Sequence, residues 1–527
     1  MAVARVACRA QVGLHAPLVH VEVSLASGLP VFCIVGLPAM VVKESKERVR
    51  AALLNSRFEF PAGRITVSLA PADLPKEGGR FDLPIALGIL LASGQIRAPA
   101  ETGGTSVARE FYGELGLTGE LKPVRGLLLA AAHAARHGHE LVVPRANAAE
   151  ACAVAPAQVR AAGHLLEVCA HLTGAAPLSP CGLPERSVRR RDEGLGAGVS
   201  LDLADVRGQL QAKRALIIAA AGAHSLLMIG PPGSGKSMLA QRLPGLLPPL
   251  THSEALEVAA VAAVSAAGFT PECLGQRPFR APHHTASAAA LVGGGARARP
   301  GEISLAHHGV LFLDELPEFE RGVLEALREP LESGVVAVSR AALQTQYPAA
   351  FQLIAAMNPC PCGRLGDPSG GCRCTPAEVR RYRARISAPL LDRLDMHVEV
   401  PRVAASEFNA ATGCGETTLA AAARIACART VQLARQQRCN ARLTDAGVQH
   451  WCVADEAGKR LLEAAMRRRG LSGRARQRVL RLARTIADLD RATIITAAHM
   501  GEAVMLRCMD RDGGATAPSA PCDRRLA

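Results

Sequence analysis

The sequence predicts a multidomain α/β protein: a mixed α+β block, then a doubly wound parallel sheet, then a helical block. Three observations predict this fold class. The chain has 527 residues, enough for about three domains. Short apolar runs alternate with helical runs in the middle of the chain, which is typical of a parallel sheet. A segment rich in Pro, Gly and charge, residues 176–197, separates the first block from the second.

The first block, residues 1–175, mixes the two kinds of local pattern. Three apolar runs favour strands, at Val19–Leu25, Ile65–Leu69 and Leu141–Pro144. Two runs rich in alanine and leucine favour helices, at Asp82–Ala92 and Gly126–Arg136. The block is therefore expected to be an α+β domain.

The rest of the chain divides into three parts. Residues 198–402 carry the alternating strands and helices expected of a parallel sheet. Residues 403–510 have helical periodicity almost throughout and are expected to form a helical lid. Residues 511–527 are a tail rich in Gly, Ala and Pro, which is expected to be disordered.

Composition excludes some classes of protein and favours others. The 61 Lys and Arg exceed the 47 Asp and Glu, and the net charge of +14 favours an anionic partner such as nucleic acid. The arginine and alanine content also fits a G+C-rich genome, so charge alone leaves that partner open. Aromatic residues make up 3%, too few to stack rows of bases, so any nucleic acid would be held by its phosphates. With no long uncharged apolar stretch and no signal-peptide layout, we expect a cytoplasmic protein without a membrane partner.

The strongest local signal is a phosphate-binding loop. A short apolar strand runs into Gly230-Pro231-Pro232-Gly233-Ser234-Gly235-Lys236-Ser237, and a helical run, Met238–Leu243, follows. This is the Walker A pattern in the strand, loop and helix context that it requires. Glycines let successive N–H groups point at a phosphate chain, and the helix N-terminus adds partial positive charge. We expect Lys236 to reach the β- and γ-phosphates of ATP and the Ser237 hydroxyl to ligate Mg²⁺.

An acidic pair supplies the second half of the expected site. Gly309-Val-Leu-Phe-Leu-Asp314-Glu315 indicates a buried parallel strand that delivers two carboxylates at its C-terminal end. Asp314 is expected to hold the Mg²⁺ shell, and Glu315 to orient or activate the attacking water as general base. Acidic pairs also occur at helix N-termini. The position after a Walker A motif favours the catalytic interpretation here.

A third strand, beginning at Phe351, ends in Asn358 before Pro359. Asn358 is placed to contact the γ-phosphate or the attacking water, although by itself a turn residue is the simpler interpretation. In third place after the two motifs, Asn358 resembles the sensor 1 residue of AAA+ ATPases.

Two arginines complete this resemblance. Arg393, in Ser387-Ala-Pro-Leu-Leu-Asp-Arg-Leu-Asp-Met, resembles the arginine finger of the magnesium-chelatase and MCM-like branch of AAA+ proteins. Arg474, in Gly470-Leu-Ser-Gly-Arg-Ala-Arg-Gln-Arg, resembles its sensor 2 residue. A solvated or carboxylate-paired arginine is the alternative for each. An arginine that acts on a neighbouring subunit requires a ring, so the resemblance implies an oligomer.

The resemblance becomes specific between the two motifs. That region contains Arg277-Pro-Phe-Arg-Ala-Pro-His-His-Thr-Ala-Ser, Leu291-Val-Gly-Gly-Gly and Pro300-Gly-Glu-Ile-Ser-Leu-Ala-His-His-Gly. Together with Asn358-Pro-Cys-Pro-Cys-Gly, they resemble the ComM family, also called YifB, of magnesium-chelatase-like AAA+ proteins, over about residues 3–510. The resemblance implies a homo-hexameric, ATP-dependent helicase that promotes branch migration during natural transformation and homologous recombination. Single-stranded and branched DNA would be its partners. A chelatase-like ATPase that remodels a protein partner is the alternative.

The first block resembles a different family, the Lon-protease-like domain. In Leu74-Pro-Lys-Glu-Gly-Gly-Arg-Phe-Asp, Arg80 stands where that family has its nucleophilic serine. In Gly119-Glu-Leu-Lys-Pro-Val-Arg-Gly-Leu-Leu, Leu128 falls at or near the place of the catalytic lysine, and Lys122 is a poor substitute. A Ser–Lys dyad needs a hydroxyl and an amine within hydrogen-bond reach. We therefore expect no peptidase activity, and a role in assembly or DNA contact.

Four cysteines form a separate cluster, Cys360-x-Cys362 and Cys372-x-Cys374. Four thiolates at this density could hold a tetrahedral Zn²⁺ as a structural clip without a catalytic water. The spacing is tighter than in the usual C-x₂-C knuckle. Free cysteines on a surface loop and a redox-sensitive disulfide are the alternatives.

Three arginine clusters are candidates for DNA contact, although each is more commonly a solvated face. They are Arg186 with Arg189–Arg191, then Arg380, Arg381, Arg383 and Arg385, then Arg467–Arg469 with Arg476, Arg478, Arg481 and Arg484. Within the family resemblance, two loops expected to face the pore of a ring are better candidates. These are residues 277–301 and the hairpin-like segment 335–347, with Arg297, Arg299 and Arg340 most involved.

Overall fold

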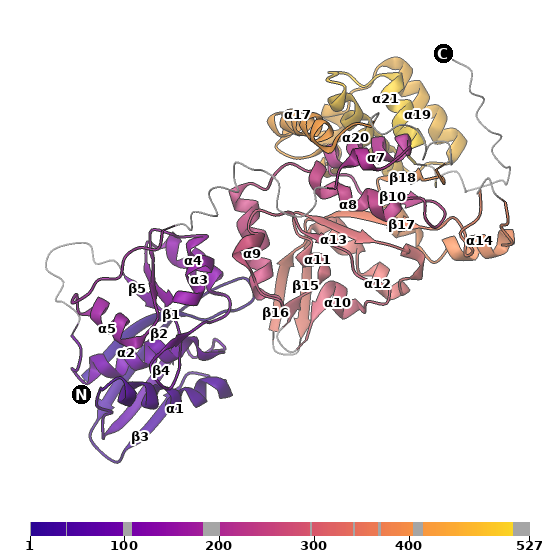
Figure 1. The fold of residues 1–527 in the computed structure, drawn as a ribbon. Coiled ribbons are helices and arrows are strands. Elements are labelled where there is room, and N and C mark those ends of the chain that lie inside the picture. Colours follow the sequence, from indigo (N-terminus) through magenta and orange to yellow (C-terminus); the bar gives the residue numbers. More distant parts are fainter. Residues whose placement is uncertain are drawn as a thin grey trace.

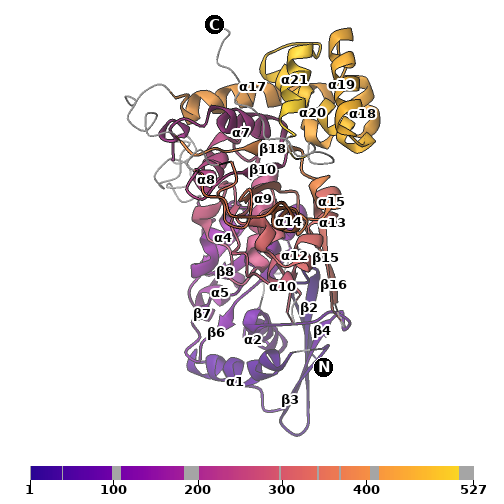
Figure 2. The same ribbon diagram turned by 90° about the vertical axis from the view of Figure 1, so that its right-hand side faces the viewer.

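The computed structural model describes residues 2–37, 39–97, 108–182, 201–295, 298–340, 343–366, 370–403, 415–507 and 509. It is a mixed α/β structure, with the N-terminal block at one end and the C-terminal helices at the other (Figures 1 and 2). Most of the expected linker and all of the expected tail lie outside the described residues. Within the described ranges, no helix is both long and apolar enough to cross a membrane.

The N-terminal block is built on a seven-stranded mixed sheet of order β3-β4-β2-β1-β5-β8-β9. The pairs β1–β2 and β2–β4 are antiparallel, and the other pairs are parallel. Alternate residues of β2 and β4 are buried, because successive side chains of a strand point to opposite faces. The strands are β1 (Ala2–Arg9), β2 (Leu18–Ala26), β3 (Val31–Val35), β4 (Arg64–Ala70), β5 (Arg109–Phe111), β8 (Glu140–Pro144) and β9 (Val159–Ala162).

In the part of this block that the structure describes, five α-helices accompany the sheet. Among them α2 is apolar all round and almost wholly buried, as a helix in the middle of a core must be. The predicted strands of this block are confirmed as β2, β4 and β8, and the predicted helices as α2 and α3. The helices are α1 (Met40–Asn55), α2 (Asp82–Ala92), α3 (Leu127–Arg136), α4 (Ala148–Cys152) and α5 (Leu165–Leu172).

The middle of the chain forms a five-stranded sheet of order β11-β14-β17-β10-β18, in which every pair is parallel. The predicted parallel sheet is thus confirmed. Because β10 lies between β17 and β18, the strand order reverses there, and ligands of such sheets bind beyond the carboxyl ends of the strands at that point. The strands are β10 (Leu226–Ile229), β11 (Phe279–Arg280), β14 (Val310–Leu313), β17 (Gln352–Met357) and β18 (Met396–Glu399).

Two hydrophobic cores cover the two faces of this sheet. Leu226 and Met228 of β10 belong to one core, whereas Leu227 and Ile229 belong to the other. Strands covered on both faces are apolar along most of their length, which explains why β10 and β14 are continuous apolar runs and why β17 is apolar after its first residue, Gln352. The first core is formed with α7 (Leu210–Gly222) and α8 (Lys236–Leu246), and the second with α10 (Ala288–Val292), α11 (Glu302–Leu305), α12 (Arg321–Glu325) and α13 (Arg328–Ser333).

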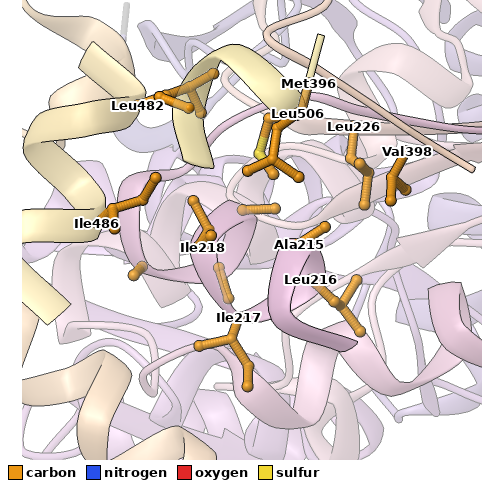
Figure 3. Close-up of a cluster of buried hydrophobic side chains, with 14 of the residues drawn as sticks. Ala215, Leu216, Ile217, Ile218, Leu226, Met396, Val398, Leu482, Ile486 and Leu506 are labelled. Atoms are coloured by element: carbon orange, nitrogen blue, oxygen red, sulfur yellow. The ribbon is translucent and has the colours of Figure 1, made fainter. Parts of the chain in front are cut away.

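The C-terminal helices share the first of these cores. Figure 3 shows Ile218 of α7, Met396 of β18 and Leu482 and Ile486 of α20 in one buried cluster. The helical block is therefore packed on the sheet, above β10 and β18 in Figure 1. Its predicted helical character is confirmed by α17 (Thr418–Gln436), α18 (Asp445–Trp451), α19 (Glu456–Arg469), α20 (Gly473–Leu489) and α21 (Ala497–Met505).

A β-hairpin contributes Val336, Val338 and Tyr347 to the second core. It pairs β15 (Val335–Arg340) with β16 (Leu343–Pro348), so the predicted hairpin is confirmed. A short pairing of β12 (Gly293–Gly294) with β13 (Arg299–Pro300) lies against β15, and a Cβ atom at Gly293 would lie 3.2 Å from a methyl group of Val338. The two segments expected to face a pore are therefore packed together.

The N-terminal block contacts the middle of the chain at two places. Leu128 of α3 is buried against Ala259 and Ala263 of α9 (His252–Val264), and Figure 1 shows the two helices side by side. Near the hairpin, Gly13 comes so close to Thr345 that a Cβ atom there would lie 2.5 Å from the threonine methyl group. The N-terminal block therefore contacts both α9 and the hairpin directly.

Candidate active site

The phosphate-binding loop follows β10 and leads directly into α8, as the sequence predicts. Gly233 (φ +74°) and Gly235 (φ +93°) have left-handed backbone conformations that L side chains rarely adopt. Gly230 is required for a different reason, since a Cβ atom there would lie 2.1 Å from the carbonyl oxygen of Val400. The remaining positions of the motif, Pro231, Pro232 and Ser234, complete the turn that places the N-terminus of α8 at the sheet edge.

The two side chains at the start of α8 lie where the motif predicts. The Lys236 ammonium group donates to the carbonyl oxygens of Gly230 (2.7 Å) and Pro231 (2.9 Å), so it is folded over its own loop. Burial lowers its pKa. The Ser237 hydroxyl donates to Oδ2 of Asp314 at 2.7 Å. The hydroxyl and carboxylate expected to ligate Mg²⁺ are therefore in direct contact, and oxygen donors of this kind suit that ion.

The acidic pair ends the buried strand β14. Asp314 Oδ1 accepts a hydrogen bond from the backbone N–H of Glu315 at 2.9 Å. Glu315 itself has a φ of +53°, a conformation that is uncommon for a residue other than glycine. Its side chain is half-exposed, and Oε2 lies 3.2 Å from Nδ1 of His284. The carboxylate expected to act as general base is thus held at the surface of the site.

Asn358 reaches the same edge of the sheet from β17. In the parallel register Ile229 of β10 pairs with Met357, so the residues after both strands are neighbours. Asn358 Oδ1 lies 3.5 Å from the Lys236 Nζ atom. The structure therefore brings together Lys236, Ser237, Asp314 and Asn358, with Glu315 adjacent to Asp314.

The two arginines predicted to act in catalysis, Arg393 and Arg474, lie among other partners than Lys236, Ser237, Asp314 and Asn358. Arg393 forms an ion pair with Glu332, 2.6 Å between Nη2 and Oε1, and donates to the carbonyl oxygen of Pro389 at 2.8 Å. Its side chain is largely buried. Arg474 is exposed in the first turn of α20. The role of Arg393 in a neighbouring subunit's site and the role of Arg474 as sensor 2 stay predictions.

A buried network around Asp395 was missed by sequence reasoning. Asp395 accepts hydrogen bonds from the backbone N–H of Ser225 (3.1 Å) and from Arg478, and lies 3.5 Å from Nδ1 of His224. Burial alone would raise the pKa of Asp395, but the hydrogen bond from His224 and the charge of Arg478 outweigh it and hold that pKa well below its usual range. Arg478 also donates to the carbonyl oxygen of Arg393 at 3.1 Å. The network therefore ties the segment of Arg393 to the sheet and to α20.

Two further residues touch the site without having been predicted. Gln209, before α7, donates to the carbonyl oxygen of Ser234 at 3.1 Å and to that of Pro401 at 2.5 Å, bridging the loop to the chain after β18. His284 contacts Glu315. His284 belongs to the pair His283-His284 in the segment that begins at Arg277. The presence of that pair in the sequence could have indicated that His284 lies at the site.

The arginines proposed to contact DNA differ in how far they are buried and in their partners. Arg481 and Arg484 belong to the interior of the helical block, where Arg484 is 2% exposed and pairs with Asp488 at 3.0 Å. Together with Arg478 they are neither a solvated face nor a DNA surface, which corrects that part of the third cluster. Arg380 and Arg381 lie on α14 (Pro376–Arg383), with Arg383 at its end. Of the arginines proposed to contact DNA, Arg186, Arg189–Arg191 and Arg297 lie outside the described ranges.

In the N-terminal block, the two positions that bear on peptidase activity are buried. Arg80 is 6% exposed and donates to the carbonyl oxygen of Arg125 at 2.6 Å and to the side chain of Gln11 at 3.1 Å. Leu128 is part of the packing against α9. Lys122 is exposed at the end of β7 (Leu121–Lys122).

The four cysteines of the cluster lie together in the loop between β17 and α14. One metal-ligating atom from each lies within 4.8 Å of the others. Cys360 is buried, Cys362 is exposed, and Cys372 and Cys374 are intermediate.

The parallel sheet, the phosphate-binding loop and the acidic pair define a P-loop fold of the magnesium-chelatase-like AAA+ class. Three family models match the chain: "Subunit ChlI of Mg-chelatase" at residues 21–147, "Magnesium chelatase, subunit ChlI" at 202–408, and "Magnesium chelatase, subunit ChlI C-terminal" at 415–507. The chain belongs to the ComM/YifB family of magnesium-chelatase-like proteins.

Individual relatives support this assignment over nearly the whole chain. A competence protein ComM of Haemophilus influenzae is 47% identical over 97% of this chain and 98% of its own length. An uncharacterized protein YifB of Salmonella typhimurium is 47% identical over the same shares. A magnesium-chelatase 67 kDa subunit of Heliobacterium mobile is 27% identical over 38% of this chain and 33% of its own length.

Proposed function

We propose that this protein is an ATP-hydrolysing motor that assembles as a ring and acts on DNA. The contact of Ser237 with Asp314, with Glu315 and Asn358 at the same sheet edge, carries the ATPase part of the proposal. A phosphate-binding loop, a metal-binding pair and a carboxylate for water are the parts that phosphoryl transfer to water requires. The family also suggests an AAA+ ATPase.

Each side chain of the site would have its own task. Lys236 would exchange its bonds to the loop carbonyls for charge-assisted bonds to the β- and γ-phosphates. Ser237 and Asp314 would hold Mg²⁺, which neutralises developing charge on the phosphates when bound. Glu315 would accept the proton of the attacking water, and Asn358 would hold that water or the γ-phosphate in place.

A ring follows from the proposed role of Arg393. A group that stabilises charge on the γ-phosphate need not belong to the chain that binds the nucleotide. In a homo-hexamer, Arg393 of each subunit would serve the next subunit's site, and Arg474 would act as the sensor 2 residue. Since Arg393 pairs with Glu332 in the isolated chain, assembly would have to release it from that pair.

Single-stranded and branched DNA are the proposed substrates. The net charge of +14 supports an anionic partner. The hairpin β15–β16 and the paired strands β12 and β13 beside it place Arg340 in β15 and Arg299 in β13. A relative of nearly equal length is a competence protein. We infer that the motor promotes branch migration during natural transformation and homologous recombination, which would place it in the cytoplasm.

We further propose that the N-terminal block is Lon-like but without peptidase activity. A guanidinium group cannot serve as the nucleophile that a Ser–Lys dyad needs, and Leu128 offers no amine. Its packing against α9 and the hairpin supports a role in assembly or DNA contact. ATP-dependent digestion of casein by the wild type, absent from Lys236→Ala, would overturn this part.

The test of the whole proposal is the ATPase rate with and without single-stranded and forked DNA. We expect strong stimulation that is lost in Lys236→Ala and Glu315→Gln. Replacement of Arg299 or Arg340 by Ala is expected to weaken DNA binding and to reduce its salt dependence, while basal ATPase activity persists. ATPase activity indifferent to every DNA would favour the alternative, remodelling of a protein partner.

A further inference from the structure

The four-cysteine loop begins two residues after Asn358 and ends just before α14. Cys360 is wholly buried and lies three residues after the end of β17, so the loop begins at the carboxyl edge of the sheet. Thr375 caps α14 by accepting from the backbone N–H of Glu378, which fixes the other end. The cluster therefore connects two rigid elements of the site.

The sulfur atoms are already spaced like the corners of a metal site. Sγ of Cys360 lies 3.4 Å from that of Cys362 and 3.8 Å from that of Cys372, and the last two are 3.7 Å apart. A tetrahedral zinc with four thiolates at about 2.3 Å has sulfur–sulfur edges of about 3.8 Å. A disulfide would need about 2.05 Å. The observed distances therefore match a shared metal ion and not a covalent pair.

The backbone around the sulfurs has the turns that such a site needs. Gly363 (φ +75°) follows Cys362, and Gly371 (φ +91°) precedes Cys372, so both cysteine pairs sit at left-handed turns. Backbone groups of Arg364 and Arg373 hydrogen-bond to the Cys362 sulfur. Donors of this kind orient thiolate ligands and offset part of their charge.

The same loop rests on the phosphate-binding loop. Gly363 is buried, and a Cβ atom there would lie 2.6 Å from Cδ of Pro232 and 3.8 Å from Cγ of Asn358. Asn358 in turn lies 3.5 Å from Lys236. A change in the shape of the cysteine loop would therefore move both Pro232 and Asn358.

We propose that Cys360, Cys362, Cys372 and Cys374 bind one Zn²⁺, and that this ion positions Asn358 against the phosphate-binding loop. All four coordination positions are taken by sulfur, so the ion has no open position for a water and is structural. Asn358 is the group that contacts the nucleotide, and the cysteines act through it. The positioning part rests on the proposed ATPase function, whereas the metal part does not.

Metal analysis of the full-length protein, purified without added metal, tests the site first. We expect one equivalent of zinc per chain, and its loss in Cys362→Ser and Cys374→Ser. Cys427→Ser is the matched control, because Cys427 is an exposed cysteine on α17, away from the cluster. Wild-type protein with well under one equivalent of zinc, with iron in its place, or with a disulfide in the loop would overturn the zinc site.

ATPase kinetics then test the positioning role. Loss of zinc is expected to lower kcat by about tenfold, with less effect on KM for ATP. In an Asn358→Ala background, Cys362→Ser should lower kcat little further, because the two changes act through one group. Additive effects, or a kcat that zinc loss leaves unchanged, would overturn the positioning role. If the serine variants fail to fold, removal of zinc from the wild type with a chelator and its restoration give the same comparison. Zinc is counted without nucleotide, so an inactive ATPase would leave the metal result intact.

Discussion

Nδ1 of His284 lies 3.2 Å from Oε2 of Glu315, which joins the segment after β11 to the carboxylate that follows β14. His284 is half-buried and Glu315 half-exposed, so the contact is at the rim of the site. The segment of His284 runs on through α10 to the paired strands β12 and β13, which lie against the hairpin. Through this contact, a change at the proposed DNA-binding segment can reach the proposed general base.

We predict that His284→Ala raises the ATPase rate in the absence of DNA by a fewfold and reduces the stimulation by DNA. The histidine would hold the Glu315 carboxylate away from the attacking water until DNA moves the segment. His283→Ala is the matched control, since the neighbouring His283 pairs with Thr285 at 2.9 Å instead. The measurement is the ATPase rate with and without forked DNA. An unchanged or lower basal rate in His284→Ala would contradict this role.

The two motif residues are expected to separate binding from hydrolysis. Lys236→Ala removes the charged group of the phosphate-binding loop itself, so binding of a fluorescent ATP analogue should be lost. Glu315→Gln keeps the loop and the Mg²⁺ ligands, so binding should persist while the hydrolysis rate falls by about 10²–10⁴-fold. Equal loss of nucleotide binding in both variants would show that Glu315 acts in binding and not as a base.

The sequence predicts those site residues whose positions follow from a single strand. Val310–Leu313 and residues 353–357 are continuous apolar runs because both faces of these strands are buried, and parallel strands place their carboxyl ends at one edge. The positions of Asp314, Glu315 and Asn358 follow from this. The Walker A loop is equally local, since Gly233 and Gly235 are required by the backbone conformation of the loop itself.

The parts that the sequence does not predict depend on which distant segments meet. Gln209 reaches Pro401, 192 residues away, and no local pattern marks either residue. Arg478, Arg481 and Arg484 recur every three residues along α20 and so resemble a basic stripe in the sequence. Their partners, Asp395, Asp445 and Asp488, show instead that this side of the helix faces carboxylates within the fold.

Loss of Arg478 is expected to destabilise the protein. Asp395 is buried and its pKa is held low, so Arg478→Ala would leave a buried carboxylate without the arginine that hydrogen-bonds to it. Removal of one partner of such a pair costs about 3 kcal/mol or more. Arg476→Ala, an exposed position on the same helix, should change the free energy of unfolding by less than about 0.5 kcal/mol. Denaturant unfolding of both variants tests this, and similar midpoints for the two would contradict it.

A mixing experiment tests the ring. Arg393→Ala is expected to lower kcat by about 10³-fold or more, the scale of a lost arginine finger. If Arg393 acts on the next subunit, a mixture of Arg393→Ala and Lys236→Ala chains contains interfaces with one intact Lys236 and one intact Arg393. Such a mixture should recover part of the ATPase activity that each variant lacks. Glu332→Gln, which removes the resting partner of Arg393, should retain activity. No recovery in the mixture would place Arg393 in its own chain's site or outside catalysis.

The last prediction concerns how stability depends on pH at His307, which lies between α9 and β14. His307 is 3% exposed, and its Nδ1 accepts from the backbone N–H of Ala350 at 3.0 Å while Nε2 lies 3.0 Å from Oε2 of Glu257. The ring is therefore neutral, with its proton on Nε2, and a second proton on Nδ1 would break the bond to Ala350. Burial, and then the charge of His308, lower the pKa of His307 to about 4.

The sign of the effect follows from this lowered pKa. Between pH 6.5 and about 4 the unfolded chain binds a proton at His307 that the folded chain does not, so stability falls as the pH falls through that window. Above pH 6.5 the contribution is fully present, and its loss is about 1.4 kcal/mol per pH unit at most. His307→Asn can still accept from Ala350 but cannot titrate. We therefore expect thermal unfolding at pH 7 and pH 5 to show a larger drop in Tm for the wild type than for His307→Asn. Equal drops in the two proteins would mean that other groups dominate the acid response of this junction.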